Sequence, residues 1–210
     1  MTTRTVILAR HGETELNRLG VVQGSGVDPS LNAEGTAQAR ALAAVFEQPF
    51  DLYLTSGMTR ASETLAAFEP DPTLVEVDDR FREICWGVHE GKVATPQSRQ
   101  AYKDLLEAWQ SGDYDAAFPA AESARELADR LLAGWDDLTS RNFERALVVM
   151  HGRALRCLTC LIDGQPLSQM DKYGHRNAGY YVVELTDDGW NITARNVTDH
   201  LAAAAATPAL

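Results

Sequence analysis

The sequence has few cysteines and no long apolar run. Its three cysteines, Cys85, Cys157 and Cys160, are too few for the disulfide framework of a small secreted protein and fit a reducing compartment. No hydrophobic stretch reaches the length of a membrane span, and the first residues lack an apolar signal core. We therefore expect a cytoplasmic protein without a membrane partner.

Basic residues are also scarce. The chain has 19 Lys and Arg against 30 Asp and Glu, which gives a net charge of −11 and a pI near 4.8. This charge balance argues against nucleic acid or an anionic lipid surface as a partner. Against such an acidic background, a pocket that gathers several arginines would stand out as a functional feature.

Two of the cysteines form a CxxC pattern, for which a redox or metal site is one interpretation. No second pair of candidate ligands matches Cys157 and Cys160, and residues 154–162 have the apolar content of a buried helix. Two packed thiols are therefore the favoured interpretation.

The chain has the size and composition of one ordinary domain. Its 210 residues are 45% hydrophobic and 23% charged. We expect a single domain over residues 1–200 with a helical lid insertion at about 92–121. The Ala-rich tail, residues 201–210, is expected to be a frayed helix or disordered.

Apolar runs alternate with amphipathic segments along the chain. Strands are expected at 5–10, 50–54, 74–77 and 146–150, helices after Asn32, over 61–68, after Thr95, over 123–138 and over 154–162, and a strand pair at 180–185 and 191–196. Thr55 and Ser56 are expected to cap the helix that follows them, and residues 165–178 to form a loop. This alternation predicts an α/β fold, a three-layer α/β/α sandwich with a mostly parallel central sheet.

Charged and imidazole side chains follow three of the predicted strands. Arg10 and His11 end the first strand, Arg60 lies in the first helical turn after the second, and His151 follows the strand at 146–150. Parallel strands place their carboxyl ends at one edge of the sheet, where open α/β sheets bind ligands. Because guanidinium groups match phosphate oxygens, the sequence predicts a phosphoryl site at this edge.

The same residues carry a family resemblance. The chain resembles the histidine phosphatase superfamily, the clan of the cofactor-dependent phosphoglycerate mutases, in its ordered motifs Arg10-His11-Gly12-Glu13-Thr14, Asn17, Gln23-Gly24, Arg60, Arg82-Glu83-Ile84, Gly87, Glu90-Gly91 and His151-Gly152.

The resemblance implies a role for each central residue. His11 would be the nucleophile that forms a phosphohistidine, while Arg10, Arg60 and His151 would bind the equatorial phosphoryl oxygens. Glu83 would act as general acid and then as general base. No metal or other cofactor is implied.

Other positions are assigned around this centre. Asn17, Gln23 and Gly24 are expected to contact the phosphate, although a glycine here is equally explained by a tight turn. Gly152 is placed with them, and Arg153, where the family usually has a small residue, is expected to add a cation at the pocket rim. Glu90 is a rival to Glu83 for the acid–base role.

The favoured function is hydrolysis of a small phosphorylated metabolite. The family's mutases carry a pair of arginines in their longer insertion, and residues 92–121 contain no Arg-Arg pair. A phosphoglycerate mutase-type transferase and a non-catalytic phospho-ligand binding protein are the alternatives. A metal hydrolase using His11, Glu13 and His151 is a further one.

Overall fold

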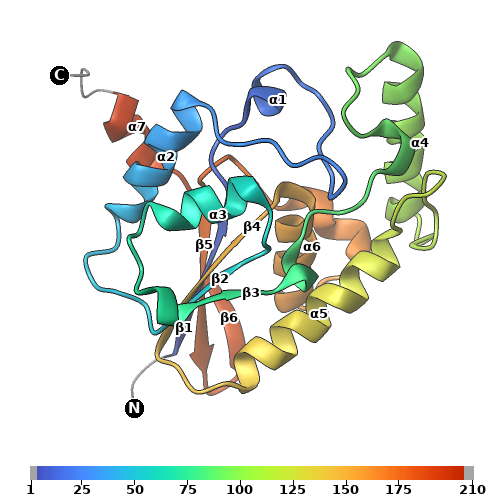
Figure 1. Ribbon diagram of the computed structural model, residues 1–210. Coiled ribbons are helices and arrows are strands. Elements are labelled where there is room, and N and C mark those ends of the chain that lie inside the picture. The colour runs from blue at the N-terminus through green and yellow to red at the C-terminus, as the bar shows by residue number, and fades with distance from the viewer. Residues whose placement is uncertain (1–3, 206–210) are drawn as a thin grey trace.

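The computed structural model describes residues 4–205, which form a six-stranded sheet between two layers of helices (Figure 1). The strands lie in the order β3 (Val75–Val77), β2 (Leu52–Thr55), β4 (Arg145–Met150), β1 (Thr5–Arg10), β5 (Tyr180–Thr186) and β6 (Gly189–Val197). The first four are mutually parallel, whereas β5 runs antiparallel to β1 and β6 antiparallel to β5. The predicted three-layer α/β/α sandwich with a mostly parallel sheet is confirmed.

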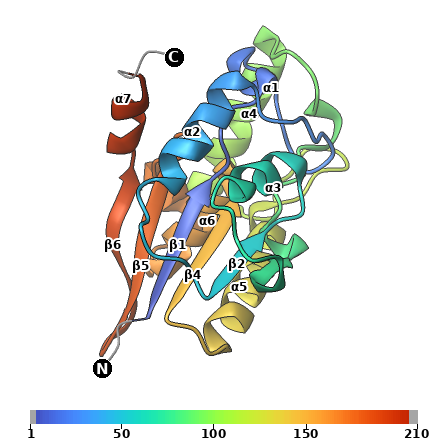
Figure 2. The ribbon, with the colours of Figure 1, turned by 60° about the vertical axis from the view of Figure 1, so that its left-hand side comes forward.

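The helices cover both faces of this sheet. One layer contains α2 (Ala33–Ala43), α3 (Thr59–Ala66) and α7 (Asp199–Ala205), and the other contains α5 (Ala124–Ser140) and α6 (Gly152–Ile162) (Figure 2). The short α1 (Glu15–Arg18) and the longer α4 (Pro96–Gln110) lie beyond the carboxyl ends of the parallel strands (Figure 1). The carboxyl edge is thus flanked by elements that belong to neither layer.

Strand β1 shows how the sequence builds both halves of the core. Val6 and Leu8 pack toward α5 and α6, and Ile7 and Ala9 pack toward α2 and α3. All four side chains are buried because successive residues of a strand point to opposite faces and helices cover both. Strand β1 therefore needs a continuous run of apolar residues, which residues 6–9 supply.

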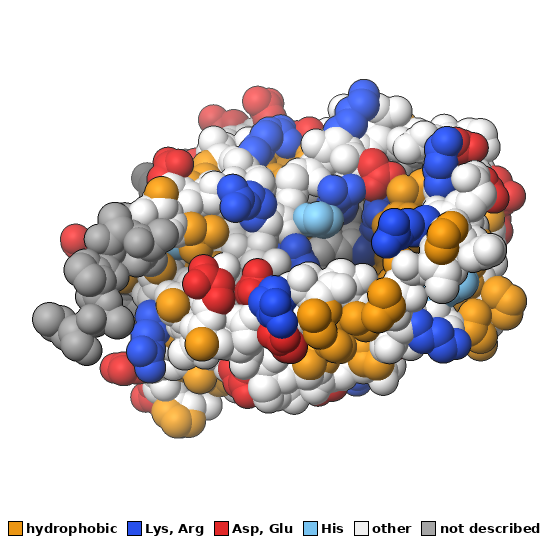
Figure 3. Space-filling view, turned by 90° about the horizontal axis from the view of Figure 1, so that it is seen from above, with side chains coloured by type: hydrophobic (Ala, Val, Ile, Leu, Met, Phe, Trp, Pro, Cys, Tyr) orange, Lys and Arg blue, Asp and Glu red, His pale blue; other side chains and the backbone are white. Residues whose placement is uncertain are grey.

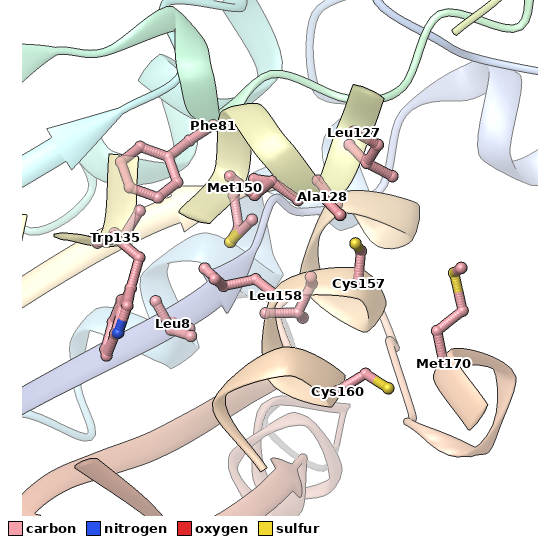
Figure 4. Close-up of a cluster of buried hydrophobic side chains, with 14 of the residues drawn as sticks. Leu8, Phe81, Leu127, Ala128, Trp135, Met150, Cys157, Leu158, Cys160 and Met170 are labelled. Carbon is pink, nitrogen blue, oxygen red and sulfur yellow. The ribbon is translucent and has the colours of Figure 1, made fainter. Parts of the chain in front are cut away.

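The two cysteines of the CxxC pattern lie in the larger half of the core. Cys157 and Cys160 of α6 are free thiols among apolar neighbours such as Leu158 and Met170 (Figure 4). Burial raises the pKa of both thiols, that of Cys160 to about 11, so neither is a reactive thiolate. The structure supports the interpretation of two packed thiols.

Several local signals act as expected. Asn32 caps α2 through a bond from Gly35 N of 2.8 Å, Thr95 caps α4, and Ser123 and Glu126 form a reciprocal capping box on α5. No helix within residues 4–205 is both long and apolar enough to cross a membrane.

Two expectations about local structure change, and the one for the tail is compatible with the structure. The predicted loop at 165–178 contains a 3-10 helix, Leu167–Lys172, because Leu167 and Met170 are buried there. Helix α3 begins after Met58 without a side-chain cap, so the capping role predicted for Thr55 and Ser56 is wrong. The Ala-rich tail is helical through Ala205, and residues 206–210 lie outside the described part of the chain.

Helix α2 packs directly on the loop that follows β1. A Cβ atom at Gly12 would lie 2.4 Å from the carbonyl oxygen of Gly35, and a Cβ at Gly35 would lie 1.9 Å from that of Glu13. Both atoms that would be met belong to the backbone and cannot swing aside. Glycine is therefore required on both sides of this contact.

The substitution Gly35→Ala tests this contact. Helix propensity alone predicts stabilisation by about 1 kcal/mol, whereas the backbone clash predicts a loss of about 1–3 kcal/mol in the free energy of unfolding. We expect the loss, measured by chemical denaturation, and no comparable effect from Thr36→Ala at the next, exposed position. A stabilised Gly35→Ala protein would contradict the contact.

Candidate active site

The predicted site residues meet at the carboxyl edge of the sheet. Arg10 ends β1 and His11 follows it, His151 follows β4, and Arg60 is the second residue of α3, which follows β2. Viewed onto this edge, the surface is hollowed near its middle, and a histidine and several Lys and Arg side chains line the hollow (Figure 3).

The two imidazoles face each other in the interior. The ring centroids of His11 and His151 are 5.2 Å apart, and the two side chains are 2% and 0% exposed. Nδ1 of His11 lies 2.6 Å from the carbonyl oxygen of Gly12, which can only accept, so Nδ1 carries the hydrogen. The lone pair of His11 is consequently on Nε2, the nitrogen that a nucleophile would use.

The surroundings keep both rings neutral. Burial lowers the pKa of His11 well below 6.5, and the positive charges of Arg10 and Arg60 lower it further. Burial likewise lowers the pKa of His151 well below 6.5, with Arg60 as the next largest cause. A neutral imidazole is the form in which a histidine nitrogen can attack phosphorus.

Ser56 orients the second imidazole. Its Oγ lies 2.7 Å from Nε2 of His151 and also accepts a bond of 3.3 Å from Met58 N. When the hydroxyl donates to Nε2, the ring hydrogen of His151 is on Nδ1. His151 Nδ1 is buried and has no partner among residues 4–205, and in that tautomer it is a donor that a phosphoryl oxygen would satisfy.

The two guanidiniums are fixed mainly by backbone carbonyls. Arg10 Nη1 donates to His175 O at 2.6 Å, and Arg60 donates to Val27 O at 2.9 Å and Gly24 O at 3.2 Å. Burial lowers the pKa of Arg10 to about 10, which still leaves it charged at neutral pH. The Nε atoms of both arginines are buried and unpartnered within the described residues. Buried donors without a partner on two positively charged groups indicate a binding site for an anion.

Glu83 is held at the start of α6. Its Oε1 accepts bonds of 3.0 Å from Ile84 N and Ala154 N, and its Oε2 accepts one of 3.0 Å from Arg153 N. These amides and the helix N-terminus stabilise its negative charge. Oε2 keeps a second lone pair, which is the position where this carboxyl can hold a proton.

Arg130 of α5 fastens the segment that carries Glu83. Its guanidinium donates to the carbonyls of Arg80 at 2.7 Å, Arg82 at 2.9 Å and Glu83 at 3.2 Å, and it is paired with Glu122 at 2.6 Å. The sequence analysis missed this residue, because a single arginine on an amphipathic helix carries no signal of its role.

The residues predicted to contact the phosphate also have structural partners. Gln23 Oε1 accepts from Thr14 Oγ1 at 2.9 Å, while its Nε2 is buried and without a partner in the described chain. Asn17 bonds the backbone of Thr14 in the capping box of α1. At Gly24 a Cβ would lie 2.6 Å from Ile84 O, so close packing explains this glycine.

The segment after His151 differs from the expectation. Gly152 begins α6, and a Cβ there would lie 3.4 Å from Arg10 Nε. The Arg153 side chain is 6% exposed and bonds Asp171 at 2.6 Å and the hydroxyl of Tyr102. Its charge is paired beneath α4 rather than free at the pocket rim.

The two other acidic candidates are engaged elsewhere. Glu90 accepts bonds of 2.7 Å from Trp86 N and Gly26 N and so ties two loops together. Glu13 accepts from Asn32 Nδ2 at 2.8 Å. Within residues 4–205, no group of three or more His, Cys, Asp or Glu side chains is arranged to hold a metal ion.

Asn177 is a further residue that the sequence analysis did not assign. Its Nδ2 donates to the carbonyls of His11 at 3.1 Å and Gly12 at 3.2 Å. It therefore connects the segment before β5 to the loop that holds the nucleophile candidate. Ser56 was considered only as a helix cap, although its place at a strand end is the signal that could have found it.

A family model and several known proteins match most of this chain. The family model of the histidine phosphatase superfamily (branch 1) matches residues 6–198. Phosphoserine phosphatase 1 of Hydrogenobacter thermophilus is 28% identical over 199 residues, which cover 93% of each chain. A 2,3-bisphosphoglycerate-dependent phosphoglycerate mutase of Methylobacterium is 32% identical over 77% of this chain and 81% of its own.

Solved structures share the fold. A phosphoserine phosphatase of Entamoeba histolytica, crystallised with 3-phosphoglyceric acid, superimposes with a TM-score of 0.81 at 25% identity, covering 94% of this chain and 99% of its own. The chain belongs to the histidine phosphatase superfamily. The similar proteins named above include a phosphatase and a mutase.

The neutral imidazoles predict how stability depends on pH. An unfolded histidine titrates near pH 6.5, whereas folded His11 and His151 stay neutral well below it. Their contribution to stability is complete above the unfolded pKa and is lost as the pH falls toward the folded pKa. From about pH 7.5 to about pH 5.5, the free energy of unfolding should fall more steeply for the native chain than for His11→Gln. Equal slopes in denaturant titrations would contradict the neutral state of His11.

Proposed function

We propose that this protein is a phosphomonoesterase that works through a phosphohistidine on His11. The observation that supports this most directly is the bond between Nδ1 of His11 and Gly12 O, which presents the Nε2 lone pair beside buried, unpartnered donors of Arg10, Arg60 and His151. A tetrahedral phosphoryl dianion satisfies those donors and places phosphorus in front of Nε2.

In the first step His11 Nε2 forms the N–P bond as the P–O bond to the leaving group breaks. Arg10 and Arg60 neutralise charge on the equatorial oxygens. Glu83 supplies the proton to the departing alkoxide from Oε2.

In the second step water attacks phosphorus and the N–P bond breaks. Glu83, now a carboxylate stabilised by three amides, accepts the proton of that water. Phosphate leaves, and His11 Nε2 regains its lone pair. The site thus uses one carboxyl as acid and then as base.

Hydrolysis is favoured over mutase activity by what surrounds the site. A mutase must hold a substrate with two anionic ends. The cavity beside Gln23 is lined by Trp86, Tyr102 and Phe118, with Arg99 as its charged lining residue in the described chain. The guanidinium of Arg153 is committed to Asp171.

His11→Ala tests the nucleophile. We expect the hydrolysis of p-nitrophenyl phosphate to fall by about 10³-fold or more because no other group can form the covalent intermediate. Asp187→Ala is the control, since Asp187 is exposed in the turn between β5 and β6 at the opposite edge of the sheet and its loss should leave the rate nearly unchanged. An active His11→Ala enzyme would eliminate the assignment.

Glu83→Gln tests the acid–base role. The variant keeps the shape of the side chain and loses the transferable proton, so kcat should fall by about 10²–10³-fold for an alkyl phosphate. The loss should be smaller for p-nitrophenyl phosphate, whose leaving group needs little protonation. Steady-state rates with both substrates measure this difference. Were Glu90→Gln to show this leaving-group pattern instead, the role would pass to Glu90.

A further inference from the structure

A cavity of about 280 Å³ lies beside the proposed phosphoryl site, between α4, the loops that precede it and the segment that follows it. Its lining includes Gln23, Trp86, His89, Arg99, Tyr102 and Phe118. A cavity of about 150 Å³ can hold benzene, so this one has room for an aromatic ring with its substituents.

The cavity is connected to the site by the residues that both share. Gln23, which lines the cavity, is bonded to Thr14 of the loop that follows His11. Trp86 is three residues after Glu83, and the Arg153 guanidinium lies 5.8 Å from the Trp86 ring while its backbone amide bonds Glu83. A leaving group whose oxygen receives a proton from Glu83 would therefore extend into this cavity.

The walls are aromatic and fixed in place. The ring of Trp86 lies 5.4 Å from that of Tyr102 and 6.4 Å from that of Phe118, and His89 lies 4.2 Å from Phe118. Behind Trp86, the ring of the buried Trp109 stacks at 6.1 Å. Such walls are arranged before a ligand binds, so little entropy is lost on binding.

The polar ends of these walls are already used. The hydroxyl of Tyr102 bonds Arg153, and Arg153 is paired with Asp171. Arg99 is exposed at the mouth and has no ion-pair partner within residues 4–205. The interior thus offers ring faces and edges rather than the paired charges that a small hydroxy acid or amino acid would need.

We infer that the substrate is a phosphomonoester whose leaving group carries an aromatic ring, which binds among Trp86, Tyr102 and Phe118. This inference rests on the proposed phosphatase function. The ring stays bound while the P–O bond breaks, and the alcohol oxygen takes its proton from Glu83. Offset or edge-to-face contacts with the wall rings favour a planar group over an aliphatic one.

The test compares alkyl phosphates whose leaving groups have similar acidity. We expect kcat/KM for 2-phenylethyl phosphate to exceed that for ethyl phosphate by about 10–100-fold, the value of burying a phenyl group, and O-phosphoserine to be no better than ethyl phosphate. Equal kcat/KM values for 2-phenylethyl phosphate and ethyl phosphate, or a higher kcat/KM for O-phosphoserine than for 2-phenylethyl phosphate, would overturn the inference.

Variants locate the effect in the cavity. Phe118→Ala should lower kcat/KM for 2-phenylethyl phosphate by about 5-fold, with ethyl phosphate hydrolysis as the internal measure of folding. Ala94→Trp, which fills the cavity, should likewise lower kcat/KM for 2-phenylethyl phosphate more than kcat/KM for ethyl phosphate. Val88→Ala, an exposed neighbour of His89 that does not line the cavity, should leave both rates unchanged. A loss that is equal for both substrates in both cavity variants would contradict the assignment.

Binding separates this inference from the proposed function. Calorimetry with non-hydrolysable benzylphosphonate and methylphosphonate needs no turnover. If benzylphosphonate binds about 10-fold more tightly but no ester is hydrolysed, the aromatic subsite stands and the phosphatase function fails. If esters are hydrolysed but the two phosphonates bind equally, the phosphatase stands and the aromatic subsite fails.

Discussion

The hydrogen bond from Nδ1 of His11 to the carbonyl oxygen of Gly12 is the interaction on which the site depends. It fixes the tautomer and aims Nε2, but only while the loop itself is held. Gly12 N donates to Thr64 Oγ1 at 3.0 Å, Asn177 bonds the carbonyls of His11 and Gly12, and Gly35 of α2 packs against the loop backbone. Contacts from three distant segments therefore support one imidazole orientation.

Charge placement follows from the same arrangement. Arg10 and Arg60 bring two buried positive charges to neutral imidazoles, and Glu83 is the carboxylate that offsets both. In a chain with a net charge of −11, this is a local reversal of sign. Backbone carbonyls hold both cations, and Asp28 lies 3.6 Å from Arg60 as an ion-pair partner. Such preorganised donors favour a phosphoryl dianion over neutral ligands.

Much of this arrangement could be predicted from the sequence. Apolar runs gave the parallel strands, and the topology then brought Arg10, His11, Arg60 and His151 to one edge. The roles of Ser56 and Arg130 could not be predicted, because each depends on a contact with a segment far away along the chain.

The surroundings of the proposed phosphoryl site could not be predicted from the sequence either. Arg153 was expected at the pocket rim, yet its side chain turns to Asp171 on a segment that the sequence marks only as a loop. The aromatic cavity joins residues of three loop segments and α4, including Trp86, Tyr102 and Phe118, and no local spacing connects them. Tertiary packing alone decides which of these side chains meet.

The central claim is covalent chemistry at His11, and the most direct measurement is to trap the intermediate. Acid-free quenching during turnover of p-nitrophenyl phosphate, followed by peptide mass spectrometry, should find an acid-labile phosphoryl group on the peptide that contains His11. A phosphoryl group on another residue, or turnover that proceeds with inversion of configuration at phosphorus and no trapped species, would contradict the account.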